Sequence, residues 1–177
     1  FLTSPREVRG LFVTSRTRAP REWRRLHAAA GGGRPERLLS RCAAGLRRGA
    51  STTRQRIVAL AWHAYENAIL ASVRTRRSPV RPIRSQKTVG RLIDKYRIQA
   101  HYLQHDCWLG ERRVLALARR AAPAHVPLFA AHRIDDPVFP VGNVQRLARA
   151  GHHAAIAAAP GTRPPGLRRP VRSVHLQ

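Results

Sequence analysis

The sequence predicts an α+β fold with extended basic termini, and three observations lead to this prediction. Between residues 51 and 159 the hydrophobic pattern is regular and gives the order helix, strand, three helices, two strands. Residues 1–50 and 160–177 carry net charges of +9 and +4. The last segment also contains four prolines, so we expect a Pro/Arg-rich C-terminal tail without a core.

The segment before residue 51 is interpreted as a basic N-terminal extension. It contains 12 arginines and only 3 acidic residues, and Gly31-Gly32-Gly33 indicates a flexible linker. Arg-rich, acid-poor leaders are typical of organellar transit peptides. A solvated basic arm accounts for the same composition equally well, so both interpretations stay open.

The first strong helix is expected to begin at Ser51-Thr52-Thr53, because these residues are good N-caps. Apolar residues then recur at helical spacing as far as Ala68. A short β-type stretch follows over residues 71–75. Pro79 and Pro82 prevent a helix in the basic loop 76–84.

The clearest periodicity follows Ser85, which can cap a second helix. Its apolar positions are separated by three or four residues: Val89, Leu92, Ile93, Tyr96, Ala100 and Leu103. A third helix is predicted from Glu111 to Ala121, and a short fourth helix over residues 127–133. Residues 138–147 and 153–159 are predicted as two strands joined by a hairpin turn at Ala150-Gly151.

The composition excludes several classes of protein. Lys and Arg outnumber Asp and Glu by 34 to 9, a formal charge of +25 that an ordinary soluble enzyme would have to carry without a counter-charged partner. Nucleic acid is the commonest polyanion that compensates such a charge. The sequence contains no run of about 18 apolar residues, so we expect no membrane-spanning helix. Two cysteines, Cys42 and Cys107, are too few for a disulfide scaffold and favour a reducing compartment.

Arginine is suited to structural RNA recognition, because its planar guanidinium group binds pairs of phosphate oxygens and stacks on bases. Helix N-termini add exposed N–H groups and a positive dipole end. Fifteen basic residues are therefore candidate RNA contacts: Arg47, Arg48, Arg54, Arg56, Arg74, Arg76, Arg77, Arg81, Arg84, Lys87, Arg91, Arg112, Arg113, Arg146 and Arg149.

Other chemistry is weakly indicated. His101 and His105 have a spacing that can bind zinc, with Cys107 nearby, but the chain has neither a His-Glu-x-x-His nor a Cys-x-x-Cys pattern. We therefore favour exposed or RNA-facing histidines and expect no metal, cofactor, catalytic residue or small-molecule substrate. Trp108 is a better candidate for stacking on a base than Tyr96, which fits a core position.

Six stretches match, in order and approximate spacing, the elements of one known family. They are residues 52–60, 73–75, 85–95, 112–118, 127–129 and 142–151. In these stretches the chain resembles the bacterial-type large-subunit ribosomal protein L-seventeen family, in an organellar form. It departs from the family at Arg54-Gln55, where His-Arg is usual, at a neutral residue early in the second helix, and in the small residues after Gly151.

The resemblance implies a small mixed sheet packed against helices over a ribosomal-protein-like domain at residues 51–159. It also implies a structural role in the large subunit of an organellar ribosome, near the exit of the nascent-peptide tunnel. The partners would be large-subunit rRNA and neighbouring large-subunit proteins, and the mitochondrial matrix is favoured over a plastid.

Two alternatives remain. The first is a stand-alone basic architectural protein that binds RNA or DNA. The second is an enzyme acting on nucleic acid, which would want clustered carboxylates for metal ions. The only adjacent carboxylate pair, Asp135-Asp136, precedes Pro137 in an expected turn.

Overall fold

The computed structural model describes residues 7–8, 12–13, 15–73, 82–105, 109–124, 128–133, 136, 141–151 and 154–159. The chain divides into two compact units. The first comprises Pro5–Trp108, and the second comprises Leu109–Gln177 with Phe1–Ser4. We call them the helical unit and the C-terminal unit and describe each by itself.

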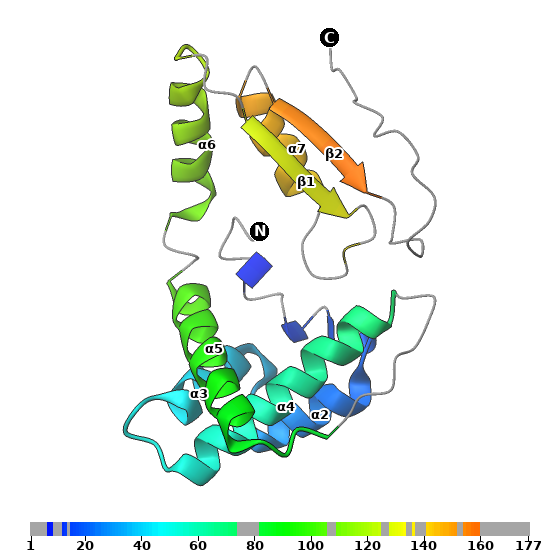
Figure 1. Cartoon of the computed structure of the whole chain (residues 1–177), viewed down its shortest axis with the longest axis vertical. Coiled ribbons are helices and arrows are strands. Elements are labelled where there is room, and N and C mark those ends of the chain that lie inside the picture. The colour runs from blue at the N-terminus through cyan, green and yellow to red at the C-terminus, as the bar shows by residue number, and fades with distance from the viewer. Residues whose placement is uncertain are drawn as a thin grey trace. The chain divides into compact units, whose positions relative to one another are not determined.

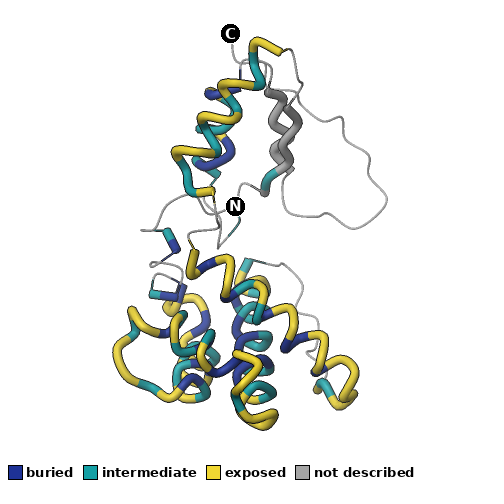
Figure 2. Tube along the Cα trace, turned by 90° about the vertical axis from the view of Figure 1, so that its left-hand side faces the viewer, coloured by how far each residue is buried: buried dark blue, intermediate teal, exposed yellow. Residues whose placement is uncertain are grey.

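In its described residues, the helical unit contains four α-helices and two short 3-10 helices. In chain order these are η1 (Ser15–Thr17), α2 (Pro20–Ala29), η2 (Pro35–Arg37), α3 (Leu38–Leu46), α4 (Thr52–Ala71) and α5 (Gln86–Gln104). Helix α4 packs against α2, α3 and α5, and α3 also packs against α5 (Figure 1). Buried residues face one another between these helices, while exposed residues lie on the outside (Figure 2).

Aromatic side chains from three segments form the centre of this core. Trp62 of α4 and Tyr96 of α5 are both buried and stack with ring centroids 5.1 Å apart. Phe12 meets Trp62 edge-on at 5.4 Å and also contacts Tyr65 at 6.1 Å. The Tyr65 hydroxyl shares a hydrogen bond of 2.6 Å with Ser15 Oγ. Segments that precede residue 51 therefore contribute to the same core as α4 and α5.

The prediction of an extended basic terminus before residue 51 is consequently wrong for the described residues. Leu26 of α2 and Leu38, Cys42 and Leu46 of α3 are fully buried. The predicted boundary at residue 51 falls between two helices of one unit. Helix α2 was not predicted because it contains three arginines and buries only Leu26, and α3 was not predicted although Leu38, Cys42 and Leu46 recur every four residues.

The three consecutive glycines form an ordered turn rather than a flexible linker. Gly31, Gly32 and Gly33 all have positive φ, at 95°, 67° and 86°, which other residues adopt only with strain. Arg41 of α3 donates hydrogen bonds to the carbonyls of Gly31 and Gly32. The His27 ring is 2.8 Å from the carbonyl oxygen of Gly33. Side chains thus satisfy the carbonyl groups beyond the end of α2.

Helices α4 and α5 confirm the two helices predicted from capping and periodicity. Ser51 Oγ accepts a hydrogen bond from the Arg54 amide at 3.3 Å, and Ser85 Oγ accepts one from the Thr88 amide at 3.4 Å. The six residues of the predicted apolar stripe on α5 are all buried. Residues 71–73 of the expected strand at 71–75 form no strand, because α4 continues to Ala71 and residues 72–73 form a turn. Residues 74–75 lie outside the described residues.

The C-terminal unit contains α6 (Gly110–Ala121), β1 (Leu128–Arg133), α7 (Val141–Ala150) and β2 (Ala154–Ala159). The two strands pair in parallel, from Leu128 opposite Ala154 to Arg133 opposite Ala159. Because parallel strands need a crossover connection, α7 links them and packs against both (Figure 1). Helix α6 confirms the predicted third helix and packs against α7.

Two further element predictions are wrong in this unit. Residues 128–133 form a strand instead of a fourth helix, and residues 141–147 belong to helix α7 instead of a strand. The apolar residues Val141, Val144 and Leu147 recur every three positions, a spacing that fits a helix better than an alternating strand. The strand at residues 154–159 is present, but it pairs with β1 and forms no hairpin with the segment before it.

The predicted α+β fold, with its order of helix, strand, three helices and two strands around a mixed sheet, is therefore wrong. The described part of the chain is mainly α-helical, with six α-helices, and its sheet is a single parallel pair. The predicted tail at residues 160–177 lies outside the described residues. Within the described ranges, no helix is both long enough and apolar enough to span a membrane.

We expect Gly45→Ala to destabilise the helical unit. A Cβ atom at the buried Gly45 would lie 2.9 Å from Cγ2 of Val58, where α3 crosses α4. Overpacking of this kind costs about 1–3 kcal/mol. Urea unfolding followed by circular dichroism would show a lower midpoint.

Gly90→Ala is the matched control. A Cβ atom at Gly90 on α5 would meet no atom within 4 Å. Alanine in an exposed helical position should stabilise by about 0.5–1 kcal/mol. Equal midpoints for the two variants would contradict the close crossing of α3 and α4.

Candidate nucleic-acid interface

Seven of the predicted RNA contacts occupy the start of α4, the start of α5 and the connection between α3 and α4. We call this set the helix-end cluster. Its members are Arg47, Arg48, Arg54, Arg56, Arg84, Lys87 and Arg91. All are exposed except Arg56, which is half-buried.

A hydrogen bond joins the two halves of this cluster, which are far apart in the sequence. The guanidinium group of Arg56 on α4 donates to Oε1 of Gln86, the first residue of α5, at 3.3 Å. The starts of the two helices therefore lie next to each other. The positive ends of both helix dipoles are in this region of the unit, which favours bound anions such as phosphate.

The connection between α3 and α4 is fixed by side chains from the neighbouring helices. The Gln55 amide nitrogen donates to the carbonyl oxygens of Ala50 at 2.7 Å and Arg47 at 3.2 Å. Arg97 of α5 donates to the Leu46 carbonyl at 2.9 Å and to Oε1 of Gln55 at 3.1 Å. These bonds hold the backbone of residues 46–51 while the side chains of Arg47 and Arg48 remain exposed.

Acidic residues do not neutralise the cluster. Between residues 37 and 93 the only acidic residue is Glu66, and Lys95 forms an ion pair with it at 2.8 Å. Asp94 is paired with Arg97 at 2.6 Å. Within the described ranges, no ion pair involves the cluster's exposed side chains, so their charge is available to a polyanion.

The structure does not bring the remaining predicted contacts into this cluster. Arg74, Arg76, Arg77 and Arg81 lie outside the described residues. The other four belong to the C-terminal unit: Arg112 and Arg113 on α6, and Arg146 and Arg149 on α7.

Arg146 has a structural role. Its guanidinium group donates to Oε1 of Glu111 on α6 at 2.5 Å and to Oδ1 of Asn143 at 2.5 Å. It therefore links α7 to α6. Arg149 is exposed.

Two groups of exposed arginines were not among the predicted RNA contacts. Arg21, Arg24 and Arg25 lie on the outward side of α2, opposite the buried Leu26. The second group, Arg119 and Arg120, is exposed near the end of α6. Spacings of three and four residues among the arginines of α2 could have revealed the first group.

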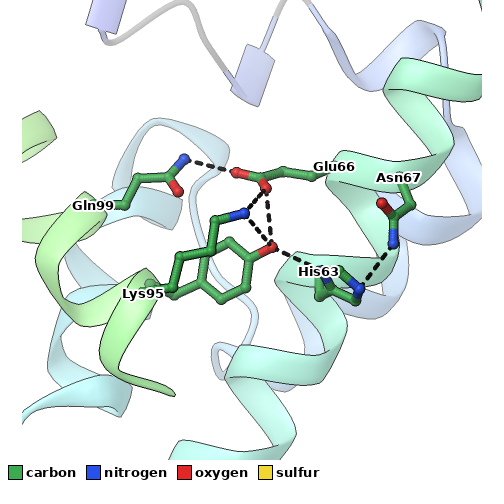
Figure 3. A network of polar contacts seen from close by, with 6 residues as sticks. His63, Glu66, Asn67, Lys95 and Gln99 are labelled. Carbon is green, nitrogen blue, oxygen red and sulfur yellow. Dashed lines mark hydrogen bonds and ion pairs between the residues drawn. The ribbon is translucent and has the colours of Figure 1, made fainter. Parts of the chain in front are cut away.

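A polar network centred on Glu66 connects α4 to α5 (Figure 3). The Glu66 carboxylate accepts hydrogen bonds from Lys95 Nζ at 2.8 Å, the Tyr96 hydroxyl at 2.9 Å and Gln99 Nε2 at 2.7 Å. Burial, followed by the charge of Glu66 and its hydrogen bond, raises the pKa of Tyr96 far above its ordinary value. Tyr96 therefore stays protonated and continues to donate.

His63 extends this network along α4. Asn67 Nδ2 is 3.0 Å from His63 Nε2, and His63 Nδ1 is 3.2 Å from the Tyr96 hydroxyl (Figure 3). When Asn67 donates to Nε2, the ring is neutral and Nδ1 donates to Tyr96. Burial, together with the nearby Lys95 charge, lowers the pKa of His63, although Glu66 acts in the opposite direction.

The histidines considered for a metal site lie near the end of α5. The rings of His101 and His105 are 4.3 Å apart, and His105 Nδ1 is 2.8 Å from the carbonyl oxygen of His101. Cys107 and Trp108 lie outside the described residues. In the part of the chain that the structure describes, no three potential metal ligands come together.

We expect acidification to weaken the fold partly through His63. Because its pKa is lower in the folded state, the unfolded chain binds the proton more readily and stability falls as the pH drops below about 6.5. Urea midpoints at about pH 7.5 and about pH 5.5 should differ less in His63→Gln than in the unmodified protein. An unchanged difference would show that His63 does not titrate with folding.

Comparison with known proteins does not place the chain in a family. No family model matches the sequence, and no curated protein shows significant similarity to it.

Proposed function

We propose that this protein is a structural RNA-binding protein without a catalytic role. The observation that carries the proposal is the helix-end cluster, whose exposed basic side chains have no acidic partners among the described residues. The excess of 34 basic over 9 acidic residues supports a polyanionic partner.

The chemistry of the cluster favours contacts to the phosphate backbone. Six of its seven residues are arginines, which bind phosphate oxygens in pairs. Contacts of this kind position an RNA without reading its sequence. With around eight phosphate contacts, the log–log slope of affinity against salt concentration should be about −6 to −7.

The particle we propose for this protein is the large subunit of an organellar ribosome, with a mitochondrial one favoured. Support comes from the ordered match of six sequence stretches to the L-seventeen family. The mixed sheet that this resemblance implies is not found in the described residues. The charge distribution is therefore the stronger support, and RNA binding is the part of the proposal that does not depend on the resemblance.

Removing four charges from the helix-end cluster should weaken RNA binding and its salt dependence together. The variant combines Arg47→Gln, Arg48→Gln, Arg84→Gln and Lys87→Gln, and it leaves unchanged Arg54 and Arg56, whose side chains make hydrogen bonds within the unit. Loss of four phosphate contacts should make the salt slope less steep by about 3. Filter binding of a labelled RNA hairpin across a salt series measures this.

The matched control removes four exposed arginines from α2 and from the turn that precedes it. It combines Arg18→Gln, Arg21→Gln, Arg24→Gln and Arg25→Gln, all in the same unit. The control should change the slope much less. Equal changes in both variants would contradict the assignment of the binding face, and unchanged binding of the cluster variant would contradict the proposed function.

Sucrose-gradient sedimentation of organelle lysate identifies the particle. Stoichiometric co-sedimentation with the large subunit, persisting through EDTA and high salt, would support the ribosomal assignment. A protein that stays at the top of the gradient would contradict it and favour a stand-alone architectural RNA-binding protein.

A further inference from the structure

The outward side of α6 is a second basic face, separate from the helix-end cluster. Four arginines lie on it in two pairs, Arg112 with Arg113 and Arg119 with Arg120, and all four are exposed. At 1.5 Å per residue, the pairs are about 10 Å apart along the helix axis. Ala116, between them, is also exposed and leaves space around the guanidinium groups.

The acidic residue of α6 does not neutralise this face. Glu111 is half-buried and paired with Arg146 of α7 at 2.5 Å. The side of α6 that carries Val114, Leu115 and Ala118 is half-buried, and α6 packs against α7. The arginine pairs therefore lie on the side left open to a partner.

The composition of this face favours RNA over a membrane surface. A helix that lies in a membrane interface presents a broad apolar side to the lipid. On α6, only Leu117 among the larger apolar side chains of the helix is exposed, beside four arginines. A surface of paired guanidinium groups with little apolar area suits phosphate groups instead.

We propose that the α6 face is a second RNA-binding site, so that one chain holds two RNA segments at once. This inference rests on the proposed function, because it takes the helix-end cluster as the first site. The two sites belong to different compact units of the chain. The protein would then cross-link RNA segments.

The test uses the full chain and two short RNA hairpins, one carrying a donor dye and the other an acceptor dye. The α6 variant combines Arg112→Gln, Arg113→Gln, Arg119→Gln and Arg120→Gln. It is compared with the helix-end variant, which also loses four positive charges. Circular dichroism confirms that each variant keeps its helical content.

The expected result is energy transfer between hairpins with the unmodified protein and two RNA equivalents bound at saturation. Each variant should bind one equivalent and lose the energy transfer. Two equivalents bound by the α6 variant, or only one by the unmodified protein, would overturn the second site. If the α6 variant still bound two RNA equivalents but lost binding to vesicles of anionic phospholipid, the face would be a membrane contact and the proposal would also be overturned.

The same measurements separate this inference from the proposed function. If the helix-end variant still binds two equivalents, the helix-end cluster fails as a site. If the α6 variant binds as many RNA equivalents as the unmodified protein, and the helix-end variant loses all RNA binding, the second site fails and the proposed function stands.

Discussion

The contact between α4 and α5 at Trp62 and Tyr96 is the constraint on which the helical unit depends. The stacking of the two rings fixes how the helices cross. The Tyr96 hydroxyl then lies at the edge of an apolar core, where it needs hydrogen-bond partners. Glu66 and His63 meet this requirement from α4. The same crossing brings Arg56 to Gln86, so the basic surface follows from the packing of the core.

Arginine has two different roles in this protein. Arg41 and Arg97 donate to backbone carbonyls where α2 and α3 end, and Arg146 joins two helices through Glu111. Arg41 and Arg97 thereby satisfy carbonyl groups that a helix end leaves without partners. The exposed Arg54 shares this role through its hydrogen bond to the Ala30 carbonyl at the end of α2, so neither exposure nor composition alone separates the two kinds.

Part of the fold could be predicted because local chemistry and packing agree there. Ser85 and the stripe that begins at Val89 define α5, since one face of the helix is buried along its whole length. Helix α3 was missed because its buried face consists of only a few residues such as Leu38 and Cys42. The parallel pair was not predicted because a crossover helix separates its two strands in the sequence. No local pattern encodes the pairing of Leu128 with Ala154. The basic residues of the helix-end cluster were predictable, but their proximity depends on a helix crossing that the sequence does not display.

The uncompensated charge of the helical unit has a consequence for the protein in the cell. Residues 5–108 contain 23 Lys and Arg and 6 Asp and Glu, so this unit carries 23 − 6 = +17 around a small core. Repulsion among these charges opposes folding, and a ligand that binds only the folded state relieves it by mass action. Chains without a partner would unfold more often and be degraded sooner. If the proposed RNA is the partner, the abundance of this protein should therefore follow the supply of that RNA.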